Sequence, residues 1–205
     1  PTVEPQGRSF DERVFIGVVL LGVIVIGAVT TASILRSRRN THASAASGAG
    51  LIAPSSARHL IDFTLTERSG RTVSRADLDG QFLVVNFVFA SCSLSCLQVN
   101  YRMAQVQRMF SSQSDVRLVS LTIDPRSDTP PVLAKFAERF SADTNRWLFL
   151  TGDKQALYLL IEKSFLGPAD PTLSGLVPGG FVNTDRIAIV DHRGQVRAIL
   201  NGMKT

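Results

Sequence analysis

The sequence predicts a mixed α/β domain preceded by one transmembrane helix. Three observations predict this: a 22-residue uncharged apolar run near the N-terminus, strand-like runs that alternate with helix-like segments, and a hairpin pattern at each end of the globular part. The 205 residues suffice for one domain of ordinary size plus extra segments. We divide the chain into an N-terminal segment (1–13), the membrane helix (14–35), a flexible linker (36–58) and the domain (59–205).

The proposed membrane helix is the run from Val14 to Leu35, which carries no charged residue. At about 1.5 Å per residue it spans roughly 33 Å, enough to cross the hydrocarbon core of a bilayer. A cleaved signal peptide is the alternative, but the apolar part of such a peptide is usually only about 7–15 residues long. The linker that follows is rich in Ala, Ser and Gly, a composition that does not bury a core.

The charges that flank this helix do not fix its orientation. Three arginines follow the span and two precede it, which favours a cytoplasmic domain by a single residue. A cysteine pair suits an oxidising compartment, and we expect the domain on the periplasmic, extracytoplasmic side of the membrane. Residues 59–205 hold 16 Lys and Arg against 14 Asp and Glu, so nothing in their charge suggests nucleic-acid binding.

The elements of the domain follow in order along the chain. Alternating residues at 62–66, a Ser-Gly turn and a short run at 72–73 predict a hairpin. Further strands are predicted at 82–89, 116–123, 147–150, 186–190 and 195–200, and helices at 94–110, 130–140 and 154–165. Candidate core residues of the first helix are Leu97, Tyr101, Ala104 and Met109. The segment 166–181 is rich in Gly and Pro and is predicted to be a loop.

Cys92 and Cys96, the only cysteines, lie between the most apolar strand and a helix. Thioredoxin-like proteins place their reactive sulfur in this way, and the element order matches a thioredoxin-like fold with a βα insertion. A helix N-terminus lowers the pKa of a thiol, which makes the cysteine a better nucleophile and metal ligand. The pair could therefore move electrons, hold copper or form a fixed cross-link.

Three motifs resemble those of the Sco/SenC family, the copper-handling assembly factors of cytochrome c oxidase. They are DFTLTERSGRTVSRADLDGQFLVVNFVFASCSLSC, LVSLTIDPRSDTP and RWLFLTG, in this order between residues 62 and 152. The resemblance implies a membrane-anchored, thioredoxin-like protein that works with cytochrome c oxidase or another respiratory complex. It also implies that Cys92 and Cys96 are thiolate ligands of copper, and that Asp124 lies near the site without binding the metal. Thiolates prefer Cu(I), whereas an imidazole helps to hold Cu(II).

The third ligand of the family, a histidine, has no counterpart here. Counting back 11 residues from Gly194 to the family position gives Asn183, whose neutral amide oxygen is a poor copper ligand. His192 imitates the local sequence around the family histidine, but its register predicts an exposed turn residue. His42 in the linker and His59 at the edge of the domain are weak substitutes.

Three hypotheses on function therefore stay open. The chain could carry Cu(I) on two thiolates, could be a metal-free thiol–disulfide oxidoreductase, or could be a non-catalytic accessory subunit whose cysteines form a fixed disulfide. The third hypothesis draws on Asn183 and on Ser93 and Leu97, which stand where the family has prolines. Asp128 and Thr129 are interpreted as residues that stabilise a turn.

Overall fold

The computed structural model describes residues 51–52, 58–92, 94–166 and 185–203, all of which belong to one compact unit, Leu51–Met203. The predicted N-terminal segment, the predicted membrane helix and most of the predicted linker lie outside these residues. Among the residues that the structure does describe, no helix combines the length and the apolar character that crossing a bilayer requires.

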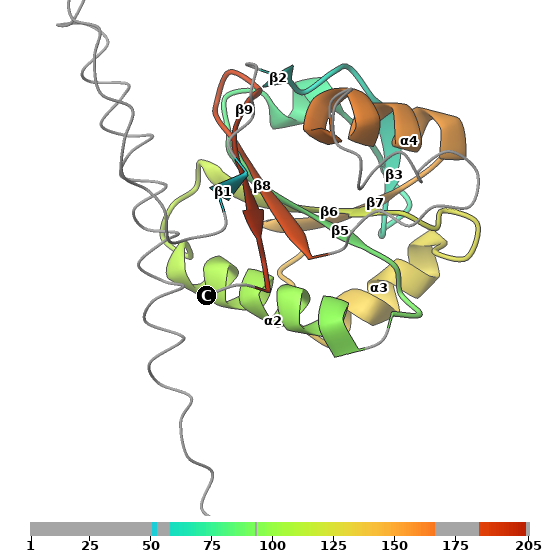
Figure 1. Ribbon diagram of the computed structural model, residues 1–205. Coiled ribbons are helices and arrows are strands. Elements are labelled where there is room, and N and C mark those ends of the chain that lie inside the picture. Colours follow the sequence, from blue (N-terminus) through green and yellow to red (C-terminus); the bar gives the residue numbers. More distant parts are fainter. Residues whose placement is uncertain (1–50, 53–57, 93, 167–184, 204–205) are drawn as a thin grey trace, which may run out of the picture. The chain divides into compact units, whose positions relative to one another are not determined.

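A nine-stranded mixed sheet forms the centre of the described unit, with the strand order β1-β9-β8-β5-β6-β7-β3-β4 and with β2 also paired to β9 (Figure 1). The strands are β1 (Leu51–Ile52), β2 (Arg58–His59), β3 (Thr64–Glu67), β4 (Thr72–Ser74), β5 (Phe82–Val88), β6 (Val116–Thr122), β7 (Trp147–Thr151), β8 (Arg186–Val190) and β9 (Gln195–Asn201). β5 is parallel to β6 and antiparallel to β8, so the most apolar strand lies in the middle of the sheet.

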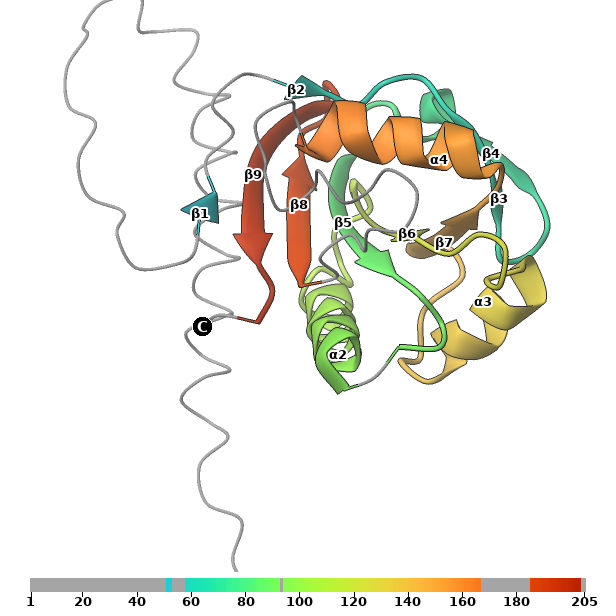
Figure 2. The ribbon, with the colours of Figure 1, turned by 45° about the vertical axis from the view of Figure 1, so that its right-hand side comes forward.

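Helices cover both faces of this sheet. They are α2 (Leu94–Met109), α3 (Pro130–Glu138) and α4 (Lys154–Ile161), with a 3-10 turn η1 (Arg75–Leu78) and a π-helical turn η2 (Glu162–Leu166). Figures 1 and 2 show α2 and α3 on one face and α4 on the other. Under α4, apolar side chains of β5, β6 and β7 form the main core with Leu157, Leu160 and Ile161. Burial of these apolar faces is the main force that holds the layers together.

The predicted succession of strands and helices is confirmed, including both hairpins and the helix after the cysteine strand. Two details differ. Leu51–Ile52 and Arg58, which composition assigned to the linker, pair with β9 through their backbone. Tyr101, a predicted core residue, is 55% exposed and lays its ring edge-on against Phe140. Ala104 is buried as predicted, and Val99, Met103 and Val106 line the buried face of α2 with it.

A chain of buried polar side chains fixes α2 to the sheet. The Trp147 indole donates to the Ser120 hydroxyl (2.8 Å), and Ser120 donates to Asn86 Oδ1 (2.6 Å). Asn86 Nδ2 in turn donates to Asn100 Oδ1 on α2 (3.2 Å). All four residues are fully buried, so each lost bond would leave a polar group without water or partner. This series of hydrogen bonds therefore sets the position of α2 on β5 and β6.

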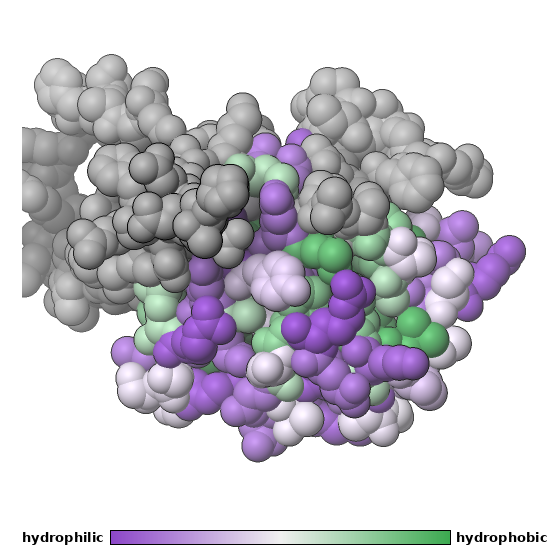
Figure 3. Space-filling view, turned by 90° about the horizontal axis from the view of Figure 1, so that it is seen from below, coloured by the Kyte–Doolittle hydropathy of each residue, from purple (hydrophilic) through white to green (hydrophobic). Residues whose placement is uncertain are grey.

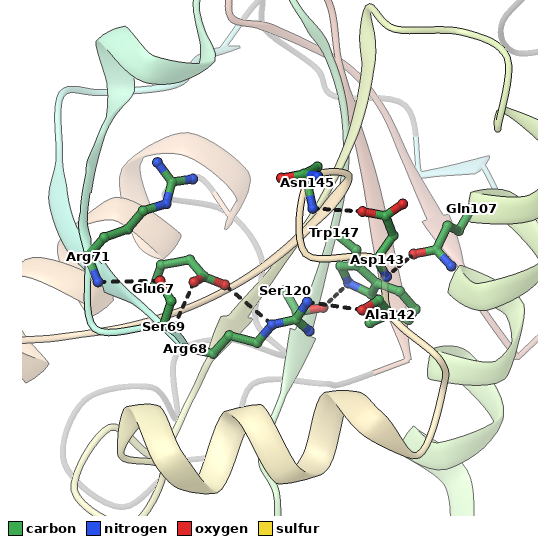
Figure 4. A network of polar contacts seen from close by, with 10 residues as sticks. All are labelled: Glu67, Arg68, Ser69, Arg71, Gln107, Ser120, Ala142, Asp143, Asn145 and Trp147. Atoms are coloured by element: carbon green, nitrogen blue, oxygen red, sulfur yellow. Dashed lines mark hydrogen bonds and ion pairs between the residues drawn. The ribbon is translucent and has the colours of Figure 1, made fainter.

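A second polar network, shown in Figure 4, joins the β3–β4 hairpin to the loop before β7. Arg68 is buried beside Glu67, donates to the Ala142 carbonyl (3.0 Å) and lies over the ring of Phe149. Glu67 accepts the backbone N–H of Ser69 (2.7 Å). Burial lowers the pKa of Arg68, and the negative charge of Glu67 opposes that change.

The face formed by α2 and α3 carries polar and apolar residues side by side, as Figure 3 shows from below. Among the described side chains of these two helices, the large exposed apolar ones are Tyr101 on α2 and Val132 on α3. Single exposed apolar residues are ordinary on a protein surface, and we attach no function to this face.

Candidate functional site

Cys92 lies at the carboxyl end of the central strand, four residues beyond the last residue of β5. Its side chain is half-buried, and its N–H closes a turn by donating to the Phe89 carbonyl (3.1 Å). Cys92 is disulfide-bonded, and the sequence contains one other cysteine, Cys96, in the first turn of α2. The site is therefore a loop between the central strand and the helix that follows it.

The loop that carries Asp124 lies at the same edge of the sheet. β5 and β6 are parallel and in register, with Val88 opposite Thr122, and the Ile123 N–H donates to the Val88 carbonyl (2.8 Å). The two strands therefore end together, and Asp124 is the second residue after β6 as Ala90 is the second residue after β5. The Asp124 carbonyl accepts the N–H of Asp128 (2.9 Å), which closes a tight turn.

Asp128 connects these two loops. Its carboxyl is 1% exposed and accepts the Ala90 N–H at 3.1 and 3.2 Å, while the Thr122 hydroxyl donates to its Oδ2. Burial raises the pKa of Asp128; the hydrogen bonds from Thr122 and Ala90 oppose this, and the charge of Asp124 adds to it. The side chain therefore holds the residue two before Cys92 against the end of β6.

Tyr158 of α4 closes the other side of the Asp124 turn. Its hydroxyl donates to the Ile123 carbonyl (2.8 Å). Burial raises the pKa of the Tyr158 phenol, and the negative charge of Asp124 raises it further. Asp124 thus lies among residues of the cysteine edge, and its predicted role as a neighbour of the site stays a prediction.

His59 and His192 lie at the opposite end of the strands, where β5 begins and β8 joins β9. His192 is in the β8–β9 turn, as predicted, but it is half-buried and its ring packs edge-on against Phe82 at the start of β5, 5.5 Å between centroids. His59 is exposed and pairs with Gln195, just after the same turn. β5 separates this end from the cysteine loop by roughly 20 Å, at about 3.3 Å per residue.

Several predicted site residues fall outside the described part of the chain. Asn183, at the position of the missing third ligand, lies there, as do Ser93 and His42. Within the described ranges, no cluster of three or more His, Cys, Asp or Glu side chains could hold a metal ion. β8, which begins three residues after Asn183, starts at the edge where β5 ends, because Ile187 pairs with Asn86.

The first turn of α2 contains no acidic residue, so nothing there offsets the partial positive charge of the helix N-terminus. Cys92 precedes α2 and Cys96 lies in its first turn, and two thiols spaced in this way can form a disulfide with each other. When reduced, they present two soft sulfur donors to a metal ion.

Sequence reasoning underrated Asp128, which it treated as a turn residue. A carboxylate in a polar Asp-Pro-Arg-Ser-Asp-Thr-Pro stretch gives no sign that it is buried. A usable signal was its place in the loop that follows a buried strand next to the cysteine strand, because the loops after parallel neighbouring strands lie at the same end of the sheet.

The fold and the site together define a thioredoxin-like protein with a cysteine pair between its central strand and the next helix. A family model, SCO1/SenC, matches residues 53–205, and the chain belongs to that family.

Individual relatives agree with this assignment. A SCO1 protein homolog of Bacillus subtilis is 33% identical over 95 residues, which cover 46% of this chain and about half (49%) of that relative. BsSco, a member of the Sco family of cytochrome c oxidase assembly proteins in which a disulfide switch was identified, is 25% identical. Its structure superposes with a TM-score of 0.61 over 73% of this chain and 86% of that one.

A third structure was determined with copper bound. It is ScoI of Bradyrhizobium japonicum, 21% identical, with a TM-score of 0.57 over 71% of this chain and 90% of that one. At this identity the likeness shows the fold alone.

Proposed function

We propose that this chain carries Cu(I) on Cys92 and Cys96 and serves the assembly of a copper site in cytochrome c oxidase. The observation that carries the proposal is a cysteine pair between the end of the central strand and the first turn of the next helix, in a domain of the SCO1/SenC family. The description of BsSco as a member of the Sco family of cytochrome c oxidase assembly proteins supports the same role.

The donor chemistry favours Cu(I) over Cu(II). Two thiolates are soft ligands that hold Cu(I) in near-linear coordination, and they need no third donor to do so. Cu(II) prefers additional nitrogen ligands, and Asn183 offers a neutral oxygen at the position where the family has histidine. We therefore expect tight Cu(I) binding and weak Cu(II) binding.

Reduction has to come before loading, because Cys92 is disulfide-bonded. Opening the disulfide takes two electrons and two protons, which a partner dithiol supplies while it becomes a disulfide itself. The reduced pair can then bind one Cu(I) ion as cargo. We place this chemistry outside the cytoplasm, on a domain held at the membrane by residues 14–35.

The test is an anaerobic titration of Cu(I) into the reduced full chain in detergent, in competition with a chromophoric chelator. We expect one Cu(I) per chain, and loss of that binding in Cys92→Ser. Ser91→Ala, which changes an exposed neighbour and no thiol, is the matched control and should bind as the wild type does. Asn183→His should add Cu(II) binding. Cu(I) binding that survives in Cys92→Ser would contradict the proposal.

A metal-free thiol–disulfide oxidoreductase is the second candidate. The disulfide at Cys92 and its half-buried position favour it, since such a bond can be reached by a partner thiol. In this case the reduced chain would fail to compete for Cu(I) but would exchange its disulfide with a dithiol. A pair that neither binds Cu(I) nor exchanges would exclude both candidates.

A further inference from the structure

Asp128 makes the hydrogen bonds that hold the middle of the cysteine loop. Both carboxyl oxygens lie within hydrogen-bond distance of the Ala90 N–H, across 38 positions of sequence. The carboxyl is almost completely buried, so water does not compete for these bonds. A buried carboxylate is costly unless it is hydrogen-bonded, and here its partners belong to the cysteine loop and to β6.

Thr122 extends this contact into a relay. Its hydroxyl donates to Asp128 Oδ2 and accepts the N–H of Asp124 (3.0 Å), and the side chain is fully buried. The two loops at the cysteine edge are thus joined through side chains as well as through the backbone bond from Ile123 to Val88. We call Asp128 and Thr122 the brace.

The brace acts on the segment between two fixed elements of the site. β5 is fixed by β6 and β8 on its two sides, and α2 is fixed by Asn100 through the buried polar chain. Between them, Ala90 receives its support from Asp128.

We propose that Asp128 is a positioning residue of the cysteine site: by holding Ala90, it keeps Cys92 in the place from which the disulfide forms. The structure contains the brace and the disulfide of Cys92 together, so the braced loop is compatible with the oxidised pair. The inference rests on the proposed function only in taking the cysteine pair as the working site.

The physical reason is preorganisation. In the dithiol, an unbraced loop samples many positions, and closing the disulfide then has to restrict it. A braced loop has already lost that freedom, which raises the effective concentration of one thiol at the other. Loss of the brace should therefore shift the equilibrium towards the dithiol, and it should weaken two-thiolate binding of Cu(I) for the same reason.

The test measures the thiol–disulfide equilibrium of the full chain in dithiothreitol buffers. In the reaction the two protein thiols lose two electrons and two protons to the cyclic disulfide of dithiothreitol, which becomes the open dithiol. Alkylation and mass measurement give the reduced fraction. For Asp128→Ala we expect the disulfide to lose about tenfold in stability, equivalent to about 30 mV for a two-electron couple. Asp128→Asn keeps an oxygen for Ala90 and should stay within about threefold of the wild type.

Asp191→Ala is the matched control. Asp191 is also a buried carboxylate that accepts loop N–H groups, but it lies at the opposite edge of the sheet. Its loss should lower the unfolding free energy and leave the thiol equilibrium unchanged. A role of Asp128 in general stability would instead make both variants alike in both measurements.

An unchanged equilibrium in folded Asp128→Ala would overturn the inference. If that variant does not fold, Thr122→Val, which removes one hydroxyl at nearly equal volume, takes its place with an expected shift of several-fold in the same direction. Copper takes no part in this measurement. Failure to bind Cu(I) with a shifted equilibrium would reject the proposed function alone, and Cu(I) binding with an unshifted equilibrium would reject the positioning role alone.

Discussion

Two buried aspartates stabilise loops at opposite edges of the same sheet, and they do so in different ways. Asp191 serves its own turn: Oδ1 accepts the N–H groups of Arg193 and Gln195 (2.9 Å each), and Oδ2 accepts from Arg197 Nε (2.7 Å). Asp128 serves a distant loop through Ala90, and the donors that it meets among the described residues, the Ala90 N–H and the Thr122 hydroxyl, are neutral. Asp191 stabilises the turn to which it belongs, whereas Asp128 joins two segments that are far apart in the sequence.

The contrast extends to the protonation of the two carboxyls. Burial alone would raise the pKa of Asp191, but the hydrogen bonds from Gln195, Arg197 and Arg193 outweigh it and the pKa is lowered. For Asp128 burial dominates and the pKa is raised. Two aspartates that are both almost inaccessible to solvent therefore have pKa values shifted in opposite directions, depending on whether a cation and enough donors meet the carboxylate.

The largest expected effect is that of Asp191→Ala on folding. The variant leaves two backbone N–H groups and the Arg197 guanidinium without their acceptor, and we expect a loss of about 3 kcal/mol in unfolding free energy. Urea unfolding followed by the fluorescence of Trp147, the single tryptophan, measures it. Asp115→Ala, at an exposed position, should change stability by less than about 0.5 kcal/mol. A loss below about 1 kcal/mol at Asp191 would mean that water replaces the carboxylate.

The next effect is a pair of opposite pH dependences. Asp128 binds its proton more tightly in the folded state, so its contribution is largest below the ordinary pKa of 3.8 and is lost as pH rises through the raised value. Asp191 binds its proton less tightly, so its contribution is present above 3.8 and is lost as pH falls through the lowered value.

We therefore expect the stability of the wild type relative to Asp128→Asn to fall with rising pH, and that relative to Asp191→Asn to rise. Urea midpoints between pH 2.5 and 7 provide the measurement. If the stability difference between wild type and variant changed with pH in the same direction at both positions, the inferred electrostatic difference between the two sites would be wrong.

The smallest effect is expected from Arg197→Gln. The Arg197 side chain is 37% exposed, so solvent screens its charge and the loss should be about 0.5–1 kcal/mol. The more specific result is a higher pKa of Asp191, seen by NMR titration of its carboxyl carbon. An unchanged pKa would show that the backbone donors alone keep this carboxyl ionised.

Residue patterns predicted most of the fold and part of the site. The apolar run of β5 and the helical pattern after Cys92 predicted the strand–cysteine–helix unit, because burial on both faces leaves a clear signal. Tyr101 was misplaced because a helix of mixed polarity does not define its buried face, and a neighbouring aromatic ring, Phe140, supports it at the surface.

Polar contacts between segments that are distant in the sequence left no recognisable pattern in the sequence. The roles of Asp128 and of the Glu67–Arg68 pair depend on segments that meet only after folding, and their sequences are as polar as an exposed loop. β1 was missed for a related reason: two residues in an Ala/Ser/Gly-rich stretch form a strand only because β9 offers an edge. Whether such a short segment forms a strand depends on the strand with which it pairs rather than on its own composition.

That borrowed strand has a consequence for how the protein can be handled. β1 and β2 pair with the outer side of β9, which would otherwise present a row of open N–H and C=O groups to solvent. A chain that starts after His59 would lack both strands and would expose β9 as an unpaired edge strand. Molecules shortened in this way should associate by pairing their exposed β9 strands. β1 and β2 therefore protect each copy from edge-to-edge aggregation.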